Sequence, residues 1–144
     1  MHNFVYPAKL APERDGGFTV RFRDLPEAIT CGDDRAEALA QAADCLAEAI
    51  AGRVSDGLEI PPPASPRRQE ALVALPAPMA AKAALYLAIR ETGLSNSAVA
   101  RRLRLDEKEI RRMLDPRHAT RLARIQEVLC ALGKRLVLSL DNAA

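Results

Sequence analysis

The 144-residue sequence predicts an α+β protein, with a β-β-β-α-β domain over residues 1–75 and a helical domain over residues 76–144. Short runs in the first half alternate apolar and polar residues, which is typical of half-buried strands. In the second half, apolar residues recur every three or four positions, which is typical of helices. The halves also differ in charge, because residues 1–75 carry a net −4 and residues 76–144 a net +6. Opposite charges indicate two different partners, and the basic half suits a polyanion such as DNA.

The composition is that of a protein with a packed core and no membrane span. Apolar residues make up 49% of the chain but aromatics only 3%, so aliphatic side chains must fill the core. No apolar run reaches about 18 residues, and the N-terminus lacks the pattern of a secretory signal. The three cysteines, Cys31, Cys45 and Cys130, form no C-x-x-C pair. We therefore expect no metal or other cofactor, and three reduced, mostly buried thiols in a cytoplasmic protein.

The first domain begins with a predicted β-hairpin. Residues 4–10 alternate with period two, and Pro7 indicates an edge position or a bulge. The turn sequence over residues 13–17 ends in two glycines, which allow a positive φ. Residues 18–23 alternate again, with apolar side chains on one face and arginines among those on the other. Two such runs across a glycine turn predict a hairpin, and residues 28–32 add a short third strand.

A helix is predicted to follow this sheet. Asp34 can be its N-cap and Glu37 can close a capping box. Gly52 is the expected stop, the four prolines within residues 60–66 exclude any helix there, and residues 70–75 predict one more strand. The expected buried stripe of the helix consists of Ala36, Leu39, Ala40, Ala43, Leu46, Ala47 and Ile50. Because this stripe is rich in alanine, the helix can lie close to the sheet.

A metal-dependent nuclease is the enzymatic alternative for this domain. Acidic residues gather near the predicted loops, at Asp24, Glu27, Asp33 and Asp34. Phosphodiester cleavage needs carboxylates that converge on metal ions from rigid elements, and the first strand carries none. No Ser, Cys or His set has nucleophile and base spacing either. We interpret the acidic residues as a helix cap and solvated loops, and predict no catalytic residue.

Three consecutive helices are predicted in the second domain. The first covers Met79–Thr92 and ends at Gly93, the second covers Asn96–Leu103, and the third covers Glu107–Leu114. Two short helices joined by a tight turn are typical of a helix-turn-helix.

Caps and packing residues favour the same motif. Ser95 can cap the second helix and Asp106 the third, with Glu109 placed to close a capping box. The turn usually holds a glycine with a left-handed backbone, and here it holds Arg104, at a cost of about 1 kcal/mol. The residues expected to pack inside the motif are Val99, Ala100, Leu103, Leu105, Ile110 and Met113.

The third helix is then the expected recognition helix, whose N-terminal residues face base edges in the major groove. Arg111 and Arg112 can read guanine in a bidentate way, whereas other arginines can contact phosphates. A solvated basic surface is the competing interpretation, most seriously for Arg101 and Arg102. The expected DNA-binding residues are Ser95, Asn96, Arg101, Arg102, Lys108, Arg111, Arg112, Arg117 and Arg121.

The end of the chain predicts a last helix and a terminal strand. Thr120 can cap the helix, whose stripe runs from Leu122 to Leu132, and Gly133 ends it. Residues 134–140 (KRLVLSL) then predict a lone strand with an unpaired edge. Pairing with the same strand of a second subunit would satisfy that edge, and a two-fold dimer would match a palindromic operator.

At this point the sequence resembles the HicB-type antitoxins of bacterial toxin–antitoxin modules, in the branch with a helix-turn-helix. The N-terminal likeness lies in GGFTVRFRDLPEAITCGDD (residues 16–34), the alanine-rich helix and LEIPPPAS (residues 58–65). The C-terminal likeness lies in MLDPRHATRL (residues 113–122) and ALGKRL (residues 131–136). Together these segments cover nearly the whole chain.

The resemblance implies a partial ribonuclease H-like N-terminal domain without catalytic carboxylates. It implies that this domain binds a small basic HicA-type toxin that cleaves mRNA, and that the C-terminal domain represses the module's own promoter as a homodimer or homotetramer. An alternative remains a stand-alone transcription factor whose N-terminal domain binds a small ligand.

Overall fold

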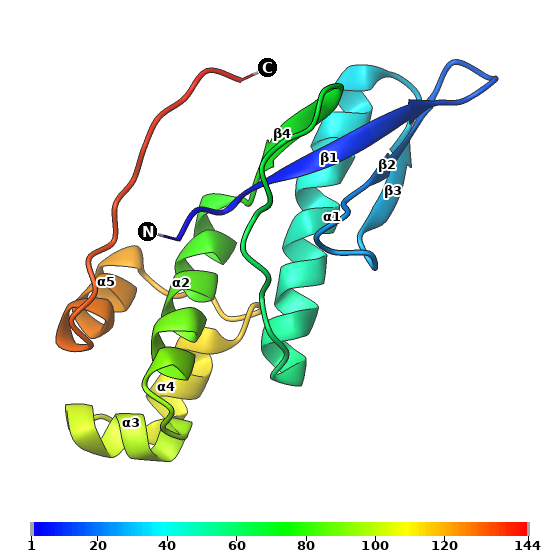
Figure 1. The fold of residues 1–144 in the computed structure, drawn as a ribbon. Helices are drawn as coiled ribbons and strands as arrows, with labels where there is room; N and C mark the ends of the chain where they lie inside the picture. Colours follow the sequence, from blue (N-terminus) through cyan, green and yellow to red (C-terminus); the bar gives the residue numbers. More distant parts are fainter. Residues whose placement is uncertain (1, 144) are drawn as a thin grey trace. The chain divides into compact units, whose positions relative to one another are not determined.

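The computed structural model describes residues 2–143, and it has four strands and five helices (Figure 1). The chain divides into two structural units. The first comprises the chain up to Gly52, then Pro61–Pro76 and the end from Asn142; the second comprises Arg53–Ile60 and Ala77–Asp141. The elements are β1 (Val5–Pro12), β2 (Phe18–Arg21), β3 (Ile29–Gly32), α1 (Arg35–Asp56), β4 (Glu70–Ala74), α2 (Ala77–Glu91), α3 (Asn96–Leu103), α4 (Glu107–Leu114) and α5 (Leu122–Ala131).

The first unit is the predicted β-β-β-α-β arrangement, with an antiparallel sheet in the order β3-β2-β1-β4. The predicted hairpin joins β1 to β2, with Leu10 opposite Val20. Its turn is closed by a 2.7 Å hydrogen bond from the Glu13 N–H to the Gly17 carbonyl, and Gly16 takes a φ of 91°. Pro7 lies in β1 opposite Leu72 of β4. It precedes Lys9, the first residue of β1 that pairs with β2.

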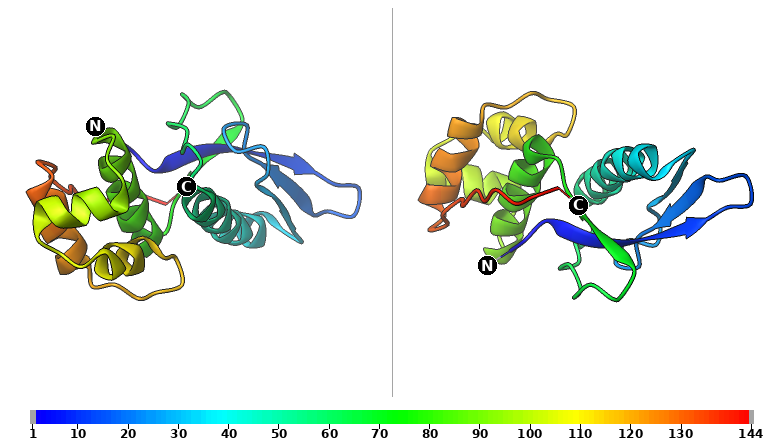
Figure 2. Two further views of the ribbon diagram at one scale, coloured as in Figure 1. Left: turned by 90° about the horizontal axis from the view of Figure 1, so that it is seen from below. Right: turned by 90° about the horizontal axis from the view of Figure 1, so that it is seen from above.

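Helix α1 covers one face of this sheet, as the two views in Figure 2 show. Asp34 caps its N-terminus as predicted, with the Glu37 N–H donating to Asp34 Oδ1 at 2.8 Å. Glu37 Oε2 accepts at 2.7 Å from the N–H of Asp33, one residue before the cap, rather than from Asp34 as a capping box requires. A Cβ on Gly32 would lie only 2.3 Å from the Ala38 nitrogen, so β3 and α1 approach closely because Gly32 has no side chain.

Two expectations about α1 are wrong. The buried side chains are every fourth residue, Ala38, Ala42, Leu46, Ile50 and Val54. Of the expected stripe only Leu46 and Ile50 are among them, whereas Ala36 and Ala40 are exposed. The helix also continues beyond Gly52 to Asp56, because Gly57, with a φ of 69°, supplies the left-handed residue that ends it.

The proline-rich segment between α1 and β4 has no regular structure and is held by polar contacts within the first unit. Arg23 donates from Nε and Nη2 to the two Glu70 oxygens, at 2.8 and 3.0 Å, and from Nη2 to the Ser65 carbonyl at 2.5 Å. The Tyr6 hydroxyl donates to the Pro61 carbonyl at 2.8 Å. Hydrogen bonds from Arg23 and from the Arg67 N–H hold the pKa of Glu70 at about 2.

The second unit is helical, with α2 in contact with both α4 and α5. The side chains of Leu85, Ile110, Ile125 and Val128 are fully buried, so a common core joins these three helices. The predicted terminal strand is a further correction, since within the described residues no strand includes 134–140. A strand exists only where a neighbour pairs with it, and this segment is drawn in Figure 1 as an extended coil.

The thiols are less buried than expected. Cys31 and Cys130 are exposed and Cys45 is half-buried, because Cys31 lies on the outermost strand β3 and Cys130 in the last turn of α5. Burial is the first cause of a raised pKa for the Cys45 thiol. No helix in the part of the chain that the structure describes is long and apolar enough to cross a membrane.

Candidate nucleic-acid interface

The turn between α3 and α4 has the geometry of a helix-turn-helix. Ser95 caps α3, its Oγ accepting from the Ala98 N–H at 3.1 Å, and Asp106 caps α4, its Oδ1 accepting from the Lys108 N–H at 2.9 Å. Arg104 occupies the left-handed region with φ 56° and ψ 43°, as the sequence predicts for this position. Val99 and Ala100 are buried where α3 contacts α4. Two capped helices therefore meet across a turn of three residues, 104–106.

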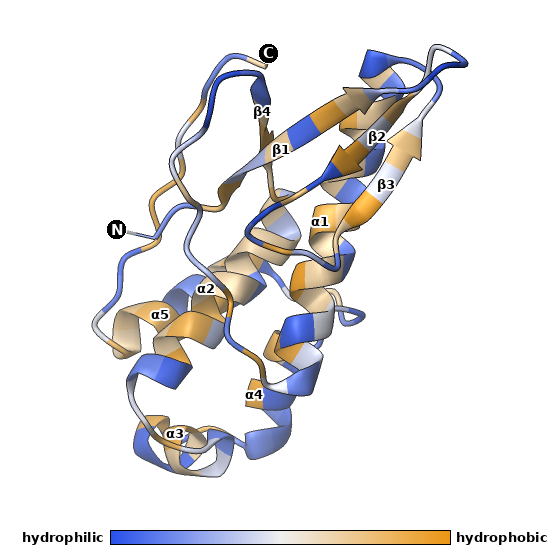
Figure 3. Ribbon diagram, turned by 45° about the vertical axis from the view of Figure 1, so that its right-hand side comes forward, coloured by the Kyte–Doolittle hydropathy of each residue, from blue (hydrophilic) through white to orange (hydrophobic). Residues whose placement is uncertain are grey.

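Helix α4 separates a buried side from a charged one. Ile110, Met113 and Leu114 are buried, and Figure 3 draws most of the rest of α4 in the colour of hydrophilic residues. Residues four apart share a helix face, so Lys108 and Arg112 lie together, opposite Ile110 and Leu114, and both are exposed. These two cations are the ones that face directly away from the domain core.

Arg111 lies on the flank of that outward face. Its Nη2 donates to Glu107 Oε1 at 2.6 Å, one helical turn back, while 67% of the side chain stays exposed. The carboxylate of Glu107 therefore partly neutralises Arg111, whereas no ion pair within the described residues involves Lys108 or Arg112.

The opposite flank of α4 is tied to α5. Arg124 donates from Nε to Glu109 Oε1 at 2.8 Å and also from Nη2 to the same oxygen. Glu109 therefore does not close the predicted capping box, because its carboxylate is directed to Arg124 rather than back to the start of α4. Sequence reasoning missed Arg124, since its partner lies 15 residues away.

The other predicted DNA-binding residues lie on α3 and on the loop before α5. Arg101 and Arg102 are exposed in the last turn of α3, and Arg117 and Arg121 are exposed in the loop over residues 115–121. Thr120 is not the cap of α5, which has Arg121 at its N-cap position without a side-chain hydrogen bond. His118 is exposed, with its Nδ1 3.3 Å from the Thr120 hydroxyl.

Thr120 instead contacts Lys82, a residue that no sequence pattern singles out. Lys82 of α2 is only 5% exposed, and its Nζ donates to the Met113 carbonyl at 2.8 Å, the Thr120 hydroxyl at 3.0 Å and the Arg112 carbonyl at 3.4 Å. A cation at the C-terminal carbonyls of a helix is favoured by the helix dipole. Burial lowers the pKa of Lys82. The C-terminal end of α4 is thus held in place by a buried ammonium group.

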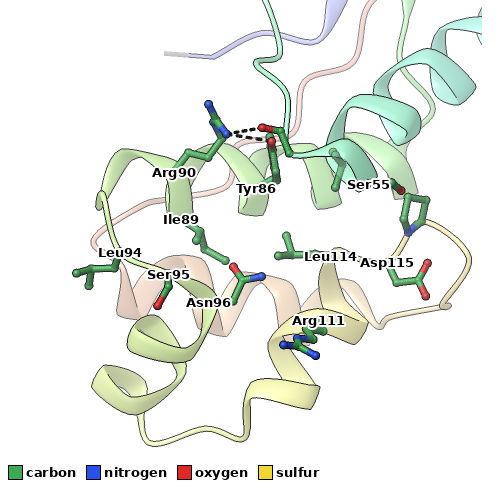
Figure 4. A pocket seen from close by; sticks show the side chains of 13 residues that line it. Ser55, Tyr86, Ile89, Arg90, Leu94, Ser95, Asn96, Arg111, Leu114 and Asp115 are labelled. Carbon is green, nitrogen blue, oxygen red and sulfur yellow. Dashed lines mark hydrogen bonds between the residues drawn. The ribbon is translucent and has the colours of Figure 1, made fainter.

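A groove of about 560 Å³ brings together three of the predicted residues, Ser95 and Asn96 at the start of α3 and Arg111 of α4. Figure 4 shows these residues with Tyr86 and Arg90 of α2. The Tyr86 hydroxyl donates to the Leu58 carbonyl at 2.7 Å, and Arg90 Nη1 donates to the Gly57 carbonyl at 3.0 Å. These bonds hold the end of α1 against α2 within the second unit.

The acidic residues near the sheet have structural partners. Asp24 Oδ2 accepts from the Ala64 N–H at 3.1 Å, and Asp34 caps α1. No group of three or more His, Cys, Asp or Glu side chains within residues 2–143 could hold a metal ion.

Comparison with known proteins agrees with the resemblance seen in the sequence. Residues 5–84 match the family described as "HicB_like antitoxin of bacterial toxin-antitoxin system". The chain belongs to the HicB antitoxin family. It is 41% identical to "Antitoxin HicB 2" of Photorhabdus laumondii, over 94% of this chain and 96% of the relative. It is 35% identical to "Antitoxin HicB" of Escherichia coli K12, over 92% of this chain and 96% of the relative.

Membership in the HicB family makes this protein the antitoxin of a HicA/HicB toxin–antitoxin system and not an enzyme. The family match lies over the sheet, α1 and the start of α2, whereas the likeness to the two whole HicB proteins extends across the helix-turn-helix.

Proposed function

We propose that this antitoxin has two binding activities in the cytoplasm. The domain over residues 1–75 binds and neutralises a HicA-type toxin that cleaves mRNA. The domain over residues 76–144 binds operator DNA through α3 and α4 and represses the operon that encodes both proteins. The observation that carries the second activity is the capped pair α3–α4, with Lys108 and Arg112 side by side on its outward face.

Neutralisation requires binding alone. An enzyme that acts on RNA must expose a basic surface to its substrate, and a domain of net charge −4 complements such a surface. Helix α1 covers one face of the sheet, Asp34 caps that helix, and Asp24 accepts a hydrogen bond from the Ala64 N–H. Bound toxin is therefore blocked from its RNA by occlusion.

DNA binding divides the basic side chains into two groups. Lys108 and Arg112 face base edges, and Arg111 lies beside them on the flank of α4 that lines the protein's own groove. Ser95 and Asn96 present the N-terminus of α3 to a phosphate. The exposed arginines Arg101, Arg102, Arg117 and Arg121 bind phosphates on either side. A homodimer or homotetramer of this chain would present two such surfaces to a palindromic operator.

The experiment that tests this proposal measures the two activities separately. The chain is co-expressed with the protein encoded beside it, and growth and co-purification report toxin binding. Binding to the DNA upstream of the operon is measured in parallel. We expect the neighbour to be toxic alone and neutralised by the wild-type chain. Lys108→Ala and Arg112→Ala are expected to weaken operator binding by about 1–3 kcal/mol each while neutralisation persists.

The matched control is Arg14→Ala, which removes an exposed arginine from the hairpin turn of the first unit. It should leave operator binding unchanged. A neighbour that is harmless and does not bind would overturn the toxin half of the proposal and favour a small ligand for the first domain. Operator binding that survives both α4 substitutions would overturn the DNA half.

A further inference from the structure

Four residues, one from each strand, form a row across the sheet of the first unit. Lys9 of β1 lies opposite Arg21 of β2 and opposite Glu70 of β4, and Arg21 lies opposite Ile29 of β3. Opposite residues point to the same side of a sheet, and side chains alternate along each strand. The residues of the alternate set next to this row are buried: Ala8, Val20 and Ala71. The row therefore lies on the face that α1 does not cover (Figure 2).

Lys9 and Arg21 oppose each other with no carboxylate between them. Both side chains are exposed, and no ion pair within residues 2–143 involves either one. Glu70 is the only acidic residue in the described strands β1–β4, and its two oxygens accept from Arg23 at 2.8 and 3.0 Å. Like charges directly opposite each other destabilise an antiparallel pair. The fold thus holds a repulsive pair of cations, and a bound anion would relieve the repulsion.

Further arginines add to the positive charge of this face. Arg23 follows β2 and reaches Glu70 on β4, with β1 lying between these two strands. Arg67 and Arg68 are exposed in the segment that precedes β4. The pKa of Glu70 is lowered first by the hydrogen bond from Arg23 and also by the charge of Arg67. The other acidic residues among 1–75 lie in α1, turns and loops, so a basic face exists within a domain of net charge −4.

The side chains of this face suit a phosphate backbone better than a protein surface. A protein interface usually has an apolar centre and a polar rim. Here the order is reversed, because the cations lie on the central strands, whereas the exposed Ile29 and Leu72 lie on the outermost strands β3 and β4.

The absence of aromatic side chains narrows the choice of nucleic acid. Single strands are bound largely by stacking of their bases on aromatic rings. The only aromatic residues within strands β1–β4 are Tyr6 and Phe18, and both belong to the alternate set of side chains, on the α1 side. A face that offers cations without rings can contact phosphates but cannot stack bases, which favours a duplex.

We propose that Lys9, Arg21, Arg67 and Arg68, which we call the basic sheet face, bind the phosphates of double-stranded DNA without regard to sequence. This role rests on the proposed DNA binding by residues 76–144, which brings a duplex to the same chain. Because both units belong to one chain, a second and weaker contact acts at a high effective concentration. Lys9 and Arg21 each neutralise one phosphate, so contacts with anions replace their mutual repulsion.

The test is the salt dependence of binding by the full chain to the DNA duplex upstream of the operon. The double variant Lys9→Gln/Arg21→Gln should lower the slope of log K against log salt concentration by about 0.9 for each cation, and the affinity about tenfold at low salt. The matched control is Arg14→Gln/Arg35→Gln, which removes two exposed arginines from the hairpin turn and the first residue of α1. Its net charge changes equally, and its slope should stay that of the wild type.

Unfolding by urea separates a lost phosphate contact from a damaged fold. Lys9→Gln/Arg21→Gln removes a like-charge pair, so it should be at least as stable as the wild type although it binds DNA less well. A lower stability would show that the two cations have partners within the fold, and would overturn the proposal. A wild-type slope in this variant, or an equal loss of slope in the control, would overturn it too.

Two further outcomes would assign the basic sheet face to another partner. If Lys9→Gln/Arg21→Gln is folded but no longer neutralises the toxin, the face binds protein and the proposal is wrong. If an RNA duplex of the same sequence binds the wild-type chain more tightly than the DNA, the assignment to DNA is wrong.

A duplex of the same length with a scrambled sequence distinguishes this role from the proposed repressor function. The basic sheet face contacts no bases, so the double variant should lower the slope on both duplexes. Equal wild-type affinity for the two duplexes, with a lowered slope in the double variant, would support the basic sheet face and remove the repressor role. A clear preference for the upstream duplex, with an unchanged slope, would do the reverse.

Discussion

Arg124 of α5 and Glu109 of α4 form an ion pair in which both Nε and Nη2 of the guanidinium donate to one carboxylate oxygen. A second pair joins Arg124 to Glu127 at 2.7 Å. Hydrogen bonds to Glu127 and Glu109 raise the pKa of Arg124, so its charge is permanent but already compensated. Arg124 therefore cannot neutralise a DNA phosphate, unlike an exposed arginine whose guanidinium has no carboxylate partner.

The salt dependence of operator binding should therefore separate Arg124 from Arg101. Each phosphate neutralised contributes about 0.9 to the slope of log K against log salt concentration. Arg101 is exposed, and no ion pair within residues 2–143 involves it, so Arg101→Ala should lower the slope by about 0.9. Arg124→Ala should leave the slope unchanged and cost less than about 1 kcal/mol of stability, because the pair is partly exposed. Equal slope changes in the two variants would contradict this assignment.

Most element boundaries could be predicted because the signals are local. Alternating side chains fix β1 and β2, and Ser95 and Asp106 mark the first residues of α3 and α4 through their own hydrogen bonds. The left-handed turn was predictable at Arg104 because the tight connection demands that conformation from whichever residue occupies it.

The failures concern contacts between distant parts of the chain. An alanine-rich helix offers several apolar stripes, and only the sheet selects the row that contains Ala38 and Leu46. A glycine inside a helix pattern, Gly52, resembles a stop, although Gly57 five residues later ends the helix. Lys82 is buried because carbonyls of α4 happen to face it, and nothing in its own neighbourhood of the sequence indicates this.

Two glycines of the first unit should respond oppositely to substitution by alanine. At Gly32 a Cβ would meet backbone atoms of Ala38 and Glu37 at 2.3–2.8 Å, so Gly32→Ala must separate β3 from α1 and should destabilise the unit by several kcal/mol. At Gly52 no atom lies within 4 Å of the added Cβ, and the helix gains about 0.5–1 kcal/mol. Denaturant unfolding of both variants measures the difference. A tolerated Gly32→Ala would contradict the close approach.

The ion pair between Arg23 and Glu70 predicts acid sensitivity of the first unit. The pKa of Glu70 is lowered from its ordinary 4.5 to about 2, chiefly by the hydrogen bond from Arg23. A carboxyl group whose pKa is lowered by folding stabilises the folded state at any pH above the pKa it has in the unfolded chain. For Glu70 this stabilisation is lost as the pH falls from about 4.5 to about 2.

Glu70→Gln should therefore cost about 1–3 kcal/mol at neutral pH, and its difference from wild type should shrink across that acidic window. Unfolding by urea at a series of pH values measures this. Glu48→Gln is the matched control, because it removes an exposed carboxylate of α1 with the same change in net charge. A Glu70→Gln deficit that stays constant down to pH 2 would show that the ion pair contributes no acid sensitivity.

Lys82 should control the position of α4 without touching DNA itself. Lys82→Met keeps the length of the side chain but leaves the Met113 carbonyl and the Thr120 hydroxyl without their donor, which should cost about 1–3 kcal/mol. At pH values between the lowered pKa of Lys82 in the folded protein and its ordinary pKa of 10.5, the unfolded chain binds more protons than the folded one. Wild-type stability should therefore rise relative to Lys82→Met as the pH increases through that window.

Operator binding gives the second readout for Lys82. Because α4 carries Lys108 and Arg112, loosening its C-terminal end should weaken operator affinity about tenfold at a temperature where the variant is fully folded. The salt slope should stay unchanged, since a buried ammonium group neutralises no phosphate. Thr120→Val, which removes a single acceptor, should have a smaller effect in the same direction. A slope lowered by about 0.9 in Lys82→Met would instead identify Lys82 as a phosphate contact, and its hydrogen bonds to α4 as incidental.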